Sequence, residues 1–106
     1  MEAKFKHGIM ELLVMKTLQE GPMTSHEVIR ALNEALEVST NTIYPILRRL
    51  HEKHYVRVEK LPSRIGAPKK RYRLTDAGEA RLMDKEAQWK DFISKALTLL
   101  GGTSDA

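Results

Sequence analysis

A short segment near the middle of the chain, residues 39–50, mixes apolar and polar side chains at helical spacing. Its apolar side chains recur every three or four positions, so they would face a core. The positions between them carry hydroxyls, an amide, a phenol and two guanidinium groups, which are groups that contact DNA phosphates and base edges. The sequence therefore predicts a DNA-binding helix, with candidate contacts at Ser39, Thr40, Asn41, Thr42, Tyr44, Pro45, Arg48 and Arg49.

Basic side chains concentrate in the same region. Residues 39–73 hold ten of the 18 Lys and Arg and two of the 14 acids, a local charge of +8, which leaves eight bases and 12 acids elsewhere. A charge run alone is more often a solvated surface. Because this one coincides with the polar helix, it favours a face that binds a polyanion. We expect further contacts at Arg64, Lys69, Lys70 and Arg71, although alternation along a strand prevents the last three from all facing DNA.

Length and composition exclude other classes of protein. At 106 residues, with 42% hydrophobic and 30% charged side chains, the chain fits a small globular protein. The absence of cysteine removes disulfides and thiolate metal sites and fits a cytoplasmic location. Neither a signal peptide nor a membrane-spanning run is visible. His51 and His54 lack a clear third ligand, and no catalytic constellation is found, so we expect no metal, no cofactor and no enzyme.

Hydrophobic periodicity places the polar helix in a helix-turn-helix. A first helix is expected over residues 5–20, ended by Gly21-Pro22. A second helix would start at Thr24, where Thr24 and Glu27 have the spacing of a capping box. The third would begin at Ser39 or Thr40, with Pro45 shaping its first turn, where many N–H groups lack partners anyway. The second helix would bury Val28, Ala31, Leu32, Ala35 and Leu36.

The pattern then changes to the two-residue period of strands. Residues 55–61 and 69–74 alternate and are separated by turn residues, which predicts a β-hairpin. The expected fold is therefore mainly α with a small β-hairpin: a winged helix-turn-helix over residues 1–74. A long helix follows over residues 75–102, and residues 103–106 would form a disordered tail. The apolar surface of the long helix exceeds what the winged-helix body needs, which predicts a homodimer.

Three blocks of sequence resemble the PadR family of bacterial and archaeal transcriptional regulators. They are Gly21-Pro22, residues 42–50 and residues 66–78, in that order, and the resemblance covers about residues 8–100. The single last helix is similar to the branch of small PadR regulators. The resemblance implies a winged-helix homodimer that binds palindromic operators in double-stranded DNA, usually as a repressor.

The resemblance also implies where the subunits and an effector would meet. Trp89 stands where a small PadR regulator of drug efflux has a tryptophan that stacks on flat aromatic drugs, so the implied effector contacts are Trp89, Phe92 and Met10. A tryptophan in an apolar stripe is more often interface core, and that alternative stays open. The last helix, together with the first, would form the dimer interface, which implies contacts at Phe5, Ile9, Leu12, Leu82, Trp89, Phe92, Ile93, Ala96, Leu99 and Leu100.

A second function remains open from the sequence. The winged helix could instead dock an acidic protein partner through the same basic face, without sequence-specific DNA binding. The two functions differ in a simple observable. DNA binding should depend steeply on salt and prefer an inverted repeat.

Overall fold

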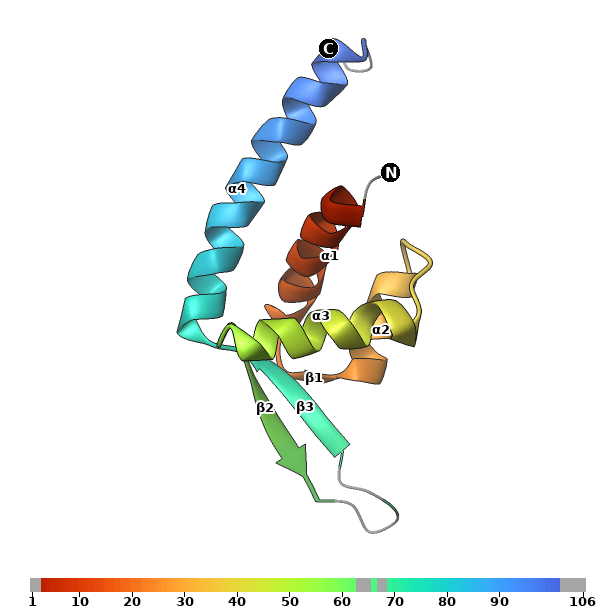
Figure 1. Cartoon of the computed structure of the whole chain (residues 1–106), viewed down its shortest axis with the longest axis vertical. Coiled ribbons are helices and arrows are strands. Elements are labelled where there is room, and N and C mark those ends of the chain that lie inside the picture. Colours follow the sequence, from red (N-terminus) through yellow and green to blue (C-terminus); the bar gives the residue numbers. More distant parts are fainter. Residues whose placement is uncertain (1–2, 63–65, 67–68, 102–106) are drawn as a thin grey trace.

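The computed structural model describes residues 3–62, 66 and 69–101. Within these ranges the winged-helix fold predicted from the sequence is confirmed (Figure 1). The helices are α1 (Ala3–Leu18), α2 (Ser25–Asn33), α3 (Thr40–Glu52) and α4 (Asp76–Leu99), and the strands are β1 (Met23–Thr24), β2 (Val56–Leu61) and β3 (Lys69–Leu74).

The sheet has one more strand than the sequence predicted. Met23 and Thr24, directly after the Gly21-Pro22 turn, form β1 and pair antiparallel with Tyr72 and Arg71 of β3. The strand order is β1-β3-β2, so the hairpin joins a three-stranded sheet. Two residues are too short to show a periodicity, which explains why sequence alone did not reveal β1.

The start of α2 follows the prediction, whereas its end does not. The capping box is complete: the Glu27 N–H donates to Thr24 Oγ1 at 3.2 Å, and the Thr24 N–H donates to Glu27 Oε1 at 2.8 Å. The helix ends at Asn33, whose side-chain Oδ1 accepts a hydrogen bond from the Val38 N–H at 2.8 Å and folds the following loop back. The predicted burial of Ala35 and Leu36 is therefore wrong, since both are exposed.

Pro45 lies inside α3, just past its first turn. Ser39 is the N-cap, and the Ile43 N–H already donates to the Ser39 carbonyl, so regular hydrogen bonding begins before the proline. Pro45 therefore removes the bond that would reach the Asn41 carbonyl, so the proline leaves one carbonyl of the first turn without its helical donor. The helix continues to Glu52 because its other face is buried in the core, through Ile43, Ile46, Leu47 and Leu50.

The core forms where α1, α2, α3, the sheet and the first part of α4 meet. Val14, Val28, Ile43, Leu47 and Leu50 are fully buried there. Two residues of the implied dimer interface belong to this core instead. Leu82 is fully buried and Leu12 is 7% exposed within their own chain, so Leu82 has no surface to offer to a second copy.

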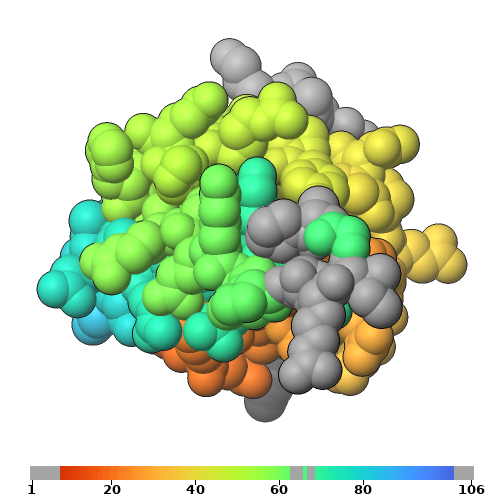
Figure 2. Space-filling view, turned by 90° about the horizontal axis from the view of Figure 1, so that it is seen from below, coloured from red at the N-terminus to blue at the C-terminus, as the bar shows by residue number. Residues whose placement is uncertain are grey.

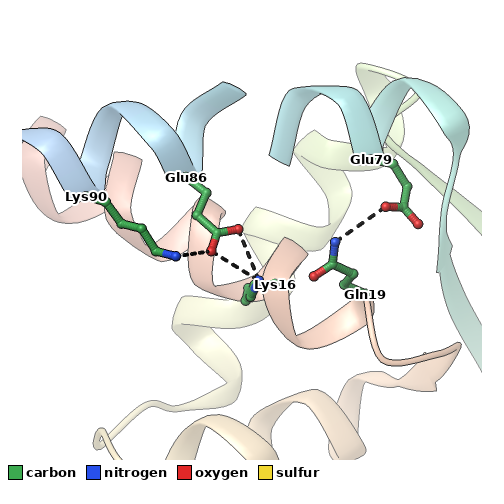
Figure 3. Close-up of polar contacts among 5 residues, drawn as sticks. All are labelled: Lys16, Gln19, Glu79, Glu86 and Lys90. Atoms are coloured by element: carbon green, nitrogen blue, oxygen red, sulfur yellow. Dashed lines mark hydrogen bonds and ion pairs between the residues drawn. The ribbon is translucent and has the colours of Figure 1, made fainter. Parts of the chain in front are cut away.

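Helix α4 has two different halves. Its first half runs beside α1, where Lys16 Nζ lies 3.1 Å from Glu86 Oε1 and Gln19 Nε2 lies 3.5 Å from Glu79 Oε1 (Figure 3). Hydrogen bonds from Lys90 and then Lys16 lower the pKa of the Glu86 carboxyl. The second half extends past the start of α1 (Figure 1) and exposes several large apolar side chains: Phe92, Ile93, Leu97, Leu99 and Leu100. Among the described helices, none is long and apolar enough to cross a membrane.

Candidate nucleic-acid interface

One face of α3 lies at the surface beside the hairpin. Figure 2 views the molecule from the hairpin end and shows α3 and the two hairpin strands on the same face. Ser39, Thr40, Asn41, Pro45 and Arg48 are exposed, while Thr42 is half-buried. Tyr44 is 46% exposed, a large aromatic side chain at the surface of a helix whose opposite face is fully buried. Such a helix can insert its polar face into a groove of DNA.

A hollow of about 440 Å³ separates this face from the hairpin, and we call it the helix–wing hollow. Positive side chains from three elements line it: Arg48 from α3, Lys60 from β2 and Lys70 from β3. Lys60 and Lys70 are direct partners across the β2–β3 pair. The complete lining consists of Tyr44, Arg48, His51, Val58, Lys60, Lys70 and Tyr72, with no carboxylate among these residues.

A second hollow, of about 310 Å³, shares three lining residues with the first, and we call it the α2 hollow. The shared residues are Tyr44, Lys70 and Tyr72. Thr24, Ser25 and His26 from the start of α2 and Lys69 from β3 complete it. The surface that could bind a polyanion therefore runs from α3 across the hairpin to the first turn of α2.

The structure separates Arg71 from the two lysines that precede it. Arg71 alternates with Lys70 and Tyr72 along β3, so its side chain lies on the opposite face of the strand. There Arg71 Nε donates to Glu59 Oε1 at 3.3 Å, and Arg73 Nε donates to Glu59 Oε2 at 3.2 Å. The hydrogen bond from Arg73, supported by Arg71, lowers the pKa of the Glu59 carboxyl. Arg71 is thus committed to an ion-paired cluster away from both hollows.

The two adjacent arginines of α3 have different surroundings. Arg49 Nε donates to Glu11 Oε2 of α1 at 2.9 Å, and Lys53 Nζ lies 4.0 Å from the same oxygen. Arg48, which lines the helix–wing hollow, has no ion pair with a carboxylate in the described part of the chain. The structure therefore brings Arg48 together with Tyr44 and leaves Arg49 on the side of α1. Arg64 lies outside the described residues.

Lys60 and Tyr72 line the surface but were missing from the candidates drawn from the sequence. Lys60 was counted only in the regional charge, and its pairing with Lys70 was the signal that could have singled it out. Tyr72 shares a strand face with Lys70 in the predicted alternation, which was the signal for it. It is buried, at 7% exposed, and it also lines both hollows.

The residues implied for an effector are only partly brought together. Trp89 and Phe92 pack edge to face, with ring centroids 5.8 Å apart, and line an open hollow of about 340 Å³ with Lys85 and Gln88. Trp89 also borders a hollow of about 430 Å³ between α1, α3 and α4. Met10 is 5% exposed in the core and lines neither of these hollows. The side chain of Phe5 lies outside the described part of the structure.

Comparison with known proteins gives a consistent result. The sequence model of the PadR-like family of transcriptional regulators matches residues 14–84. No curated protein matches the chain. Among solved structures, a PadR-like transcription factor from Bacteroides fragilis is 33% identical, with 92% of this chain and 95% of that chain covered and a TM-score of 0.82.

Two further structures bear on the fold. A PadR family transcriptional regulator from Eggerthella lenta is 30% identical, with 92% of this chain and 86% of that chain covered and a TM-score of 0.80. PadR from Bacillus subtilis, solved in complex with operator DNA, is 20% identical and has a TM-score of 0.66, with 72% of this chain and 45% of that chain covered. At that identity the Bacillus subtilis structure shows a shared fold.

Proposed function

This chain belongs to the PadR-like family of transcriptional regulators, and we propose that it binds an inverted-repeat operator in double-stranded DNA as a homodimer and represses transcription there. The family consists of transcriptional regulators and not of enzymes. The observation that carries the proposal is the helix–wing hollow, where cations from α3, β2 and β3 converge beside the exposed face of a helix. A regulator of this kind would act in the cytoplasm.

The geometry suggests how the contacts divide. The first turn of α3 offers short polar side chains, Ser39, Thr40 and Asn41, which suit base edges in the major groove. Tyr44 and Arg48 lie further along the helix toward the hairpin and suit the DNA backbone. In a two-fold dimer, the two copies of α3 would enter successive major grooves about 34 Å apart. PadR from Bacillus subtilis, which shares the fold, was solved in complex with operator DNA, and this supports DNA binding by a chain of this fold.

Selection of bound sites from random DNA tests the proposal. We expect an inverted repeat to be recovered and its affinity to fall steeply between low and moderate salt, because Lys and Arg contacts to phosphates release counterions. Weak binding with no sequence preference would contradict the proposal. It would favour the alternative in which the basic face docks an acidic protein.

The exposed half of α4 supports the dimer. Phe92, Ile93 and Leu97 are each more than 40% exposed and lie on one stripe of the helix. A second copy of the chain would cover this stripe. Ile9 of α1, which is only partly buried, would add to the proposed contact. Ala96, Leu99 and Leu100 extend the proposed contact toward the C-terminal end of α4.

Ile93→Glu is expected to convert the dimer to a monomer, because it places a charge in an apolar interface. Ser94→Glu is the matched control, since it adds the same charge one residue away, off the stripe, at an exposed position. Sedimentation equilibrium would measure the mass of each variant. A monomeric wild-type chain, or equal dissociation by both substitutions, would contradict the proposed interface.

A small aromatic effector that binds beside Trp89 completes the proposal. It is supported by the open hollow that Trp89 and Phe92 line. The chain has one tryptophan, so its intrinsic tryptophan fluorescence reports on this site alone. We expect planar aromatic compounds that stack on the indole to quench this emission. If no member of a varied panel changes the emission, the effector part of the proposal fails while the DNA-binding part stands.

A further inference from the structure

The hydroxyl of Tyr72 has no hydrogen-bond partner in the part of the chain that the structure describes. Tyr72 lies in the middle of β3 with 7% of its surface exposed, and its ring packs in the core cluster. Among the described residues, none forms a hydrogen bond with its hydroxyl. Buried tyrosine hydroxyls normally find a partner, because an unmatched polar group loses its hydration without compensation. Because Tyr72 also lines two surface hollows, a ligand that enters them can supply the missing partner.

The surroundings of Tyr72 define the chemistry of that ligand. Tyr72 lines both the helix–wing hollow and the α2 hollow, and Tyr44 and Lys70 are the two residues that share this position. Arg48 and Lys60 add positive charge on one side, and Lys69 adds it on the other. None of the described residues that line the two hollows is a carboxylate, so the side chains around Tyr72 supply donors and positive charge.

The protonation state of the phenol fits the same ligand. Burial raises the pKa of Tyr72 above its ordinary value of 10.0, and the neighbouring Tyr44 adds to the rise, while Arg48 opposes it. The phenol therefore stays protonated near neutral pH and can donate a hydrogen bond. A group that is anionic, accepts several hydrogen bonds and reaches a helix–hairpin junction from DNA is a backbone phosphate. Base edges present donors as well as acceptors and match this lining less well.

We propose that the helix–wing hollow is a socket for a single DNA backbone phosphate, in which Tyr44 and Tyr72 donate hydrogen bonds and Arg48 and Lys70 provide charge. The proposal rests on the proposed DNA binding and adds the buried Tyr72 to the contact surface. Because the socket joins α3 to the hairpin, the phosphate it holds would fix how α3 is placed in the neighbouring groove. Tyr72 then serves both the core, through its ring, and the ligand, through its hydroxyl.

Tyr72→Phe tests the socket, since it removes one oxygen and keeps the ring in the core. On a duplex that carries the selected inverted repeat, we expect affinity to fall by roughly tenfold or more, as for loss of a hydrogen bond to a charged group. The salt dependence should stay unchanged because the phenol is neutral, whereas Lys70→Ala should lower the salt slope by about one per bound subunit. Tyr55→Phe is the matched control, because this half-buried phenol has its ring beside Arg81 at 5.8 Å and lines neither hollow.

A scan with single methylphosphonates, which neutralise one phosphate at a time, separates a contact from a structural effect. At one position in each half-site, the methylphosphonate should weaken Tyr72→Phe less than it weakens the wild-type chain, because the variant has already lost the phenol contact and keeps only the charge contacts of Arg48 and Lys70 with that phosphate. Wild-type affinity in Tyr72→Phe, or an equal response at every phosphate, would overturn the socket alone. Absence of DNA binding by the wild-type chain would overturn the proposed function itself.

Discussion

Gly78→Ala is expected to destabilise the fold by about 3 kcal/mol, near the upper end for overpacking a filled site. A methyl group at this position would overlap the carbonyl oxygen of Tyr55 and come within 3.0 Å of Leu74 Cδ2. The carbonyl cannot rotate away, because it accepts a hydrogen bond from the Thr75 N–H at 3.1 Å. A second bond, from Thr75 Oγ1 to the His54 carbonyl at 2.7 Å, holds the start of α4 against the same turn.

Urea unfolding of the two variants Gly78→Ala and Gly8→Ala measures this effect against a matched control. Gly8 is also helical, but a methyl group there would lie 3.7 Å from Trp89 Cζ2, an ordinary contact. Gly8→Ala should therefore be neutral or stabilise the chain by up to about 1 kcal/mol, the helix-propensity gain. Since a small domain has only about 5–15 kcal/mol of stability in total, the difference between the variants is easily resolved. Equal midpoints would show that α4 does not approach Tyr55 this closely.

Arg48→Ala and Arg49→Ala are expected to have opposite consequences, although the two residues are adjacent and carry the same charge. Arg48 lines the helix–wing hollow with Tyr44 and Tyr72, so its loss should lower DNA affinity by roughly tenfold or more. The salt slope should fall by about one per bound subunit, since one phosphate contact is removed from each. Arg49 is held by Glu11 on the far side of α3, so its loss should leave DNA affinity close to wild type.

The free energy of unfolding should fall in Arg49→Ala and not in Arg48→Ala. Removal of Arg49 breaks a partly exposed ion pair between α3 and α1, which should cost up to about 1 kcal/mol of unfolding free energy. Removal of Arg48 breaks no ion pair within the described residues, so its stability should be unchanged. DNA titrations and urea midpoints on the same preparations would check both halves. A greater loss of DNA affinity in Arg49→Ala would mean that α3 presents its other side to DNA.

Much of the fold follows from local rules that the sequence displays. The capping box at Thr24 and Glu27 and the apolar stripe of α3 need only residues within a few positions of one another, and both are found as predicted. The sequence-based predictions were wrong where contacts outside the regular helical and strand spacing determine the structure. β1 exists because Met23 meets Tyr72, and α2 ends early because the Asn33 side chain bonds the backbone of Val38. Propensity and periodicity carry no information on such pairings.

By itself, the sequence determined which side chains share a face of α3 or of β3, because helical and strand periods fix those faces. It also determined the basic character of residues 39–73, because the net charge of a segment follows from its composition alone. Only the tertiary structure decided which of these cations remain available for DNA. Arg49 is paired by a carboxylate 38 residues earlier in the chain, and Arg71 by one 12 residues earlier, on the neighbouring strand. Packing also placed Tyr72 beside Tyr44 in both hollows and left its hydroxyl without a partner among the described residues. Such placements depend on how side chains fill space in three dimensions and not on the order of residues along the chain.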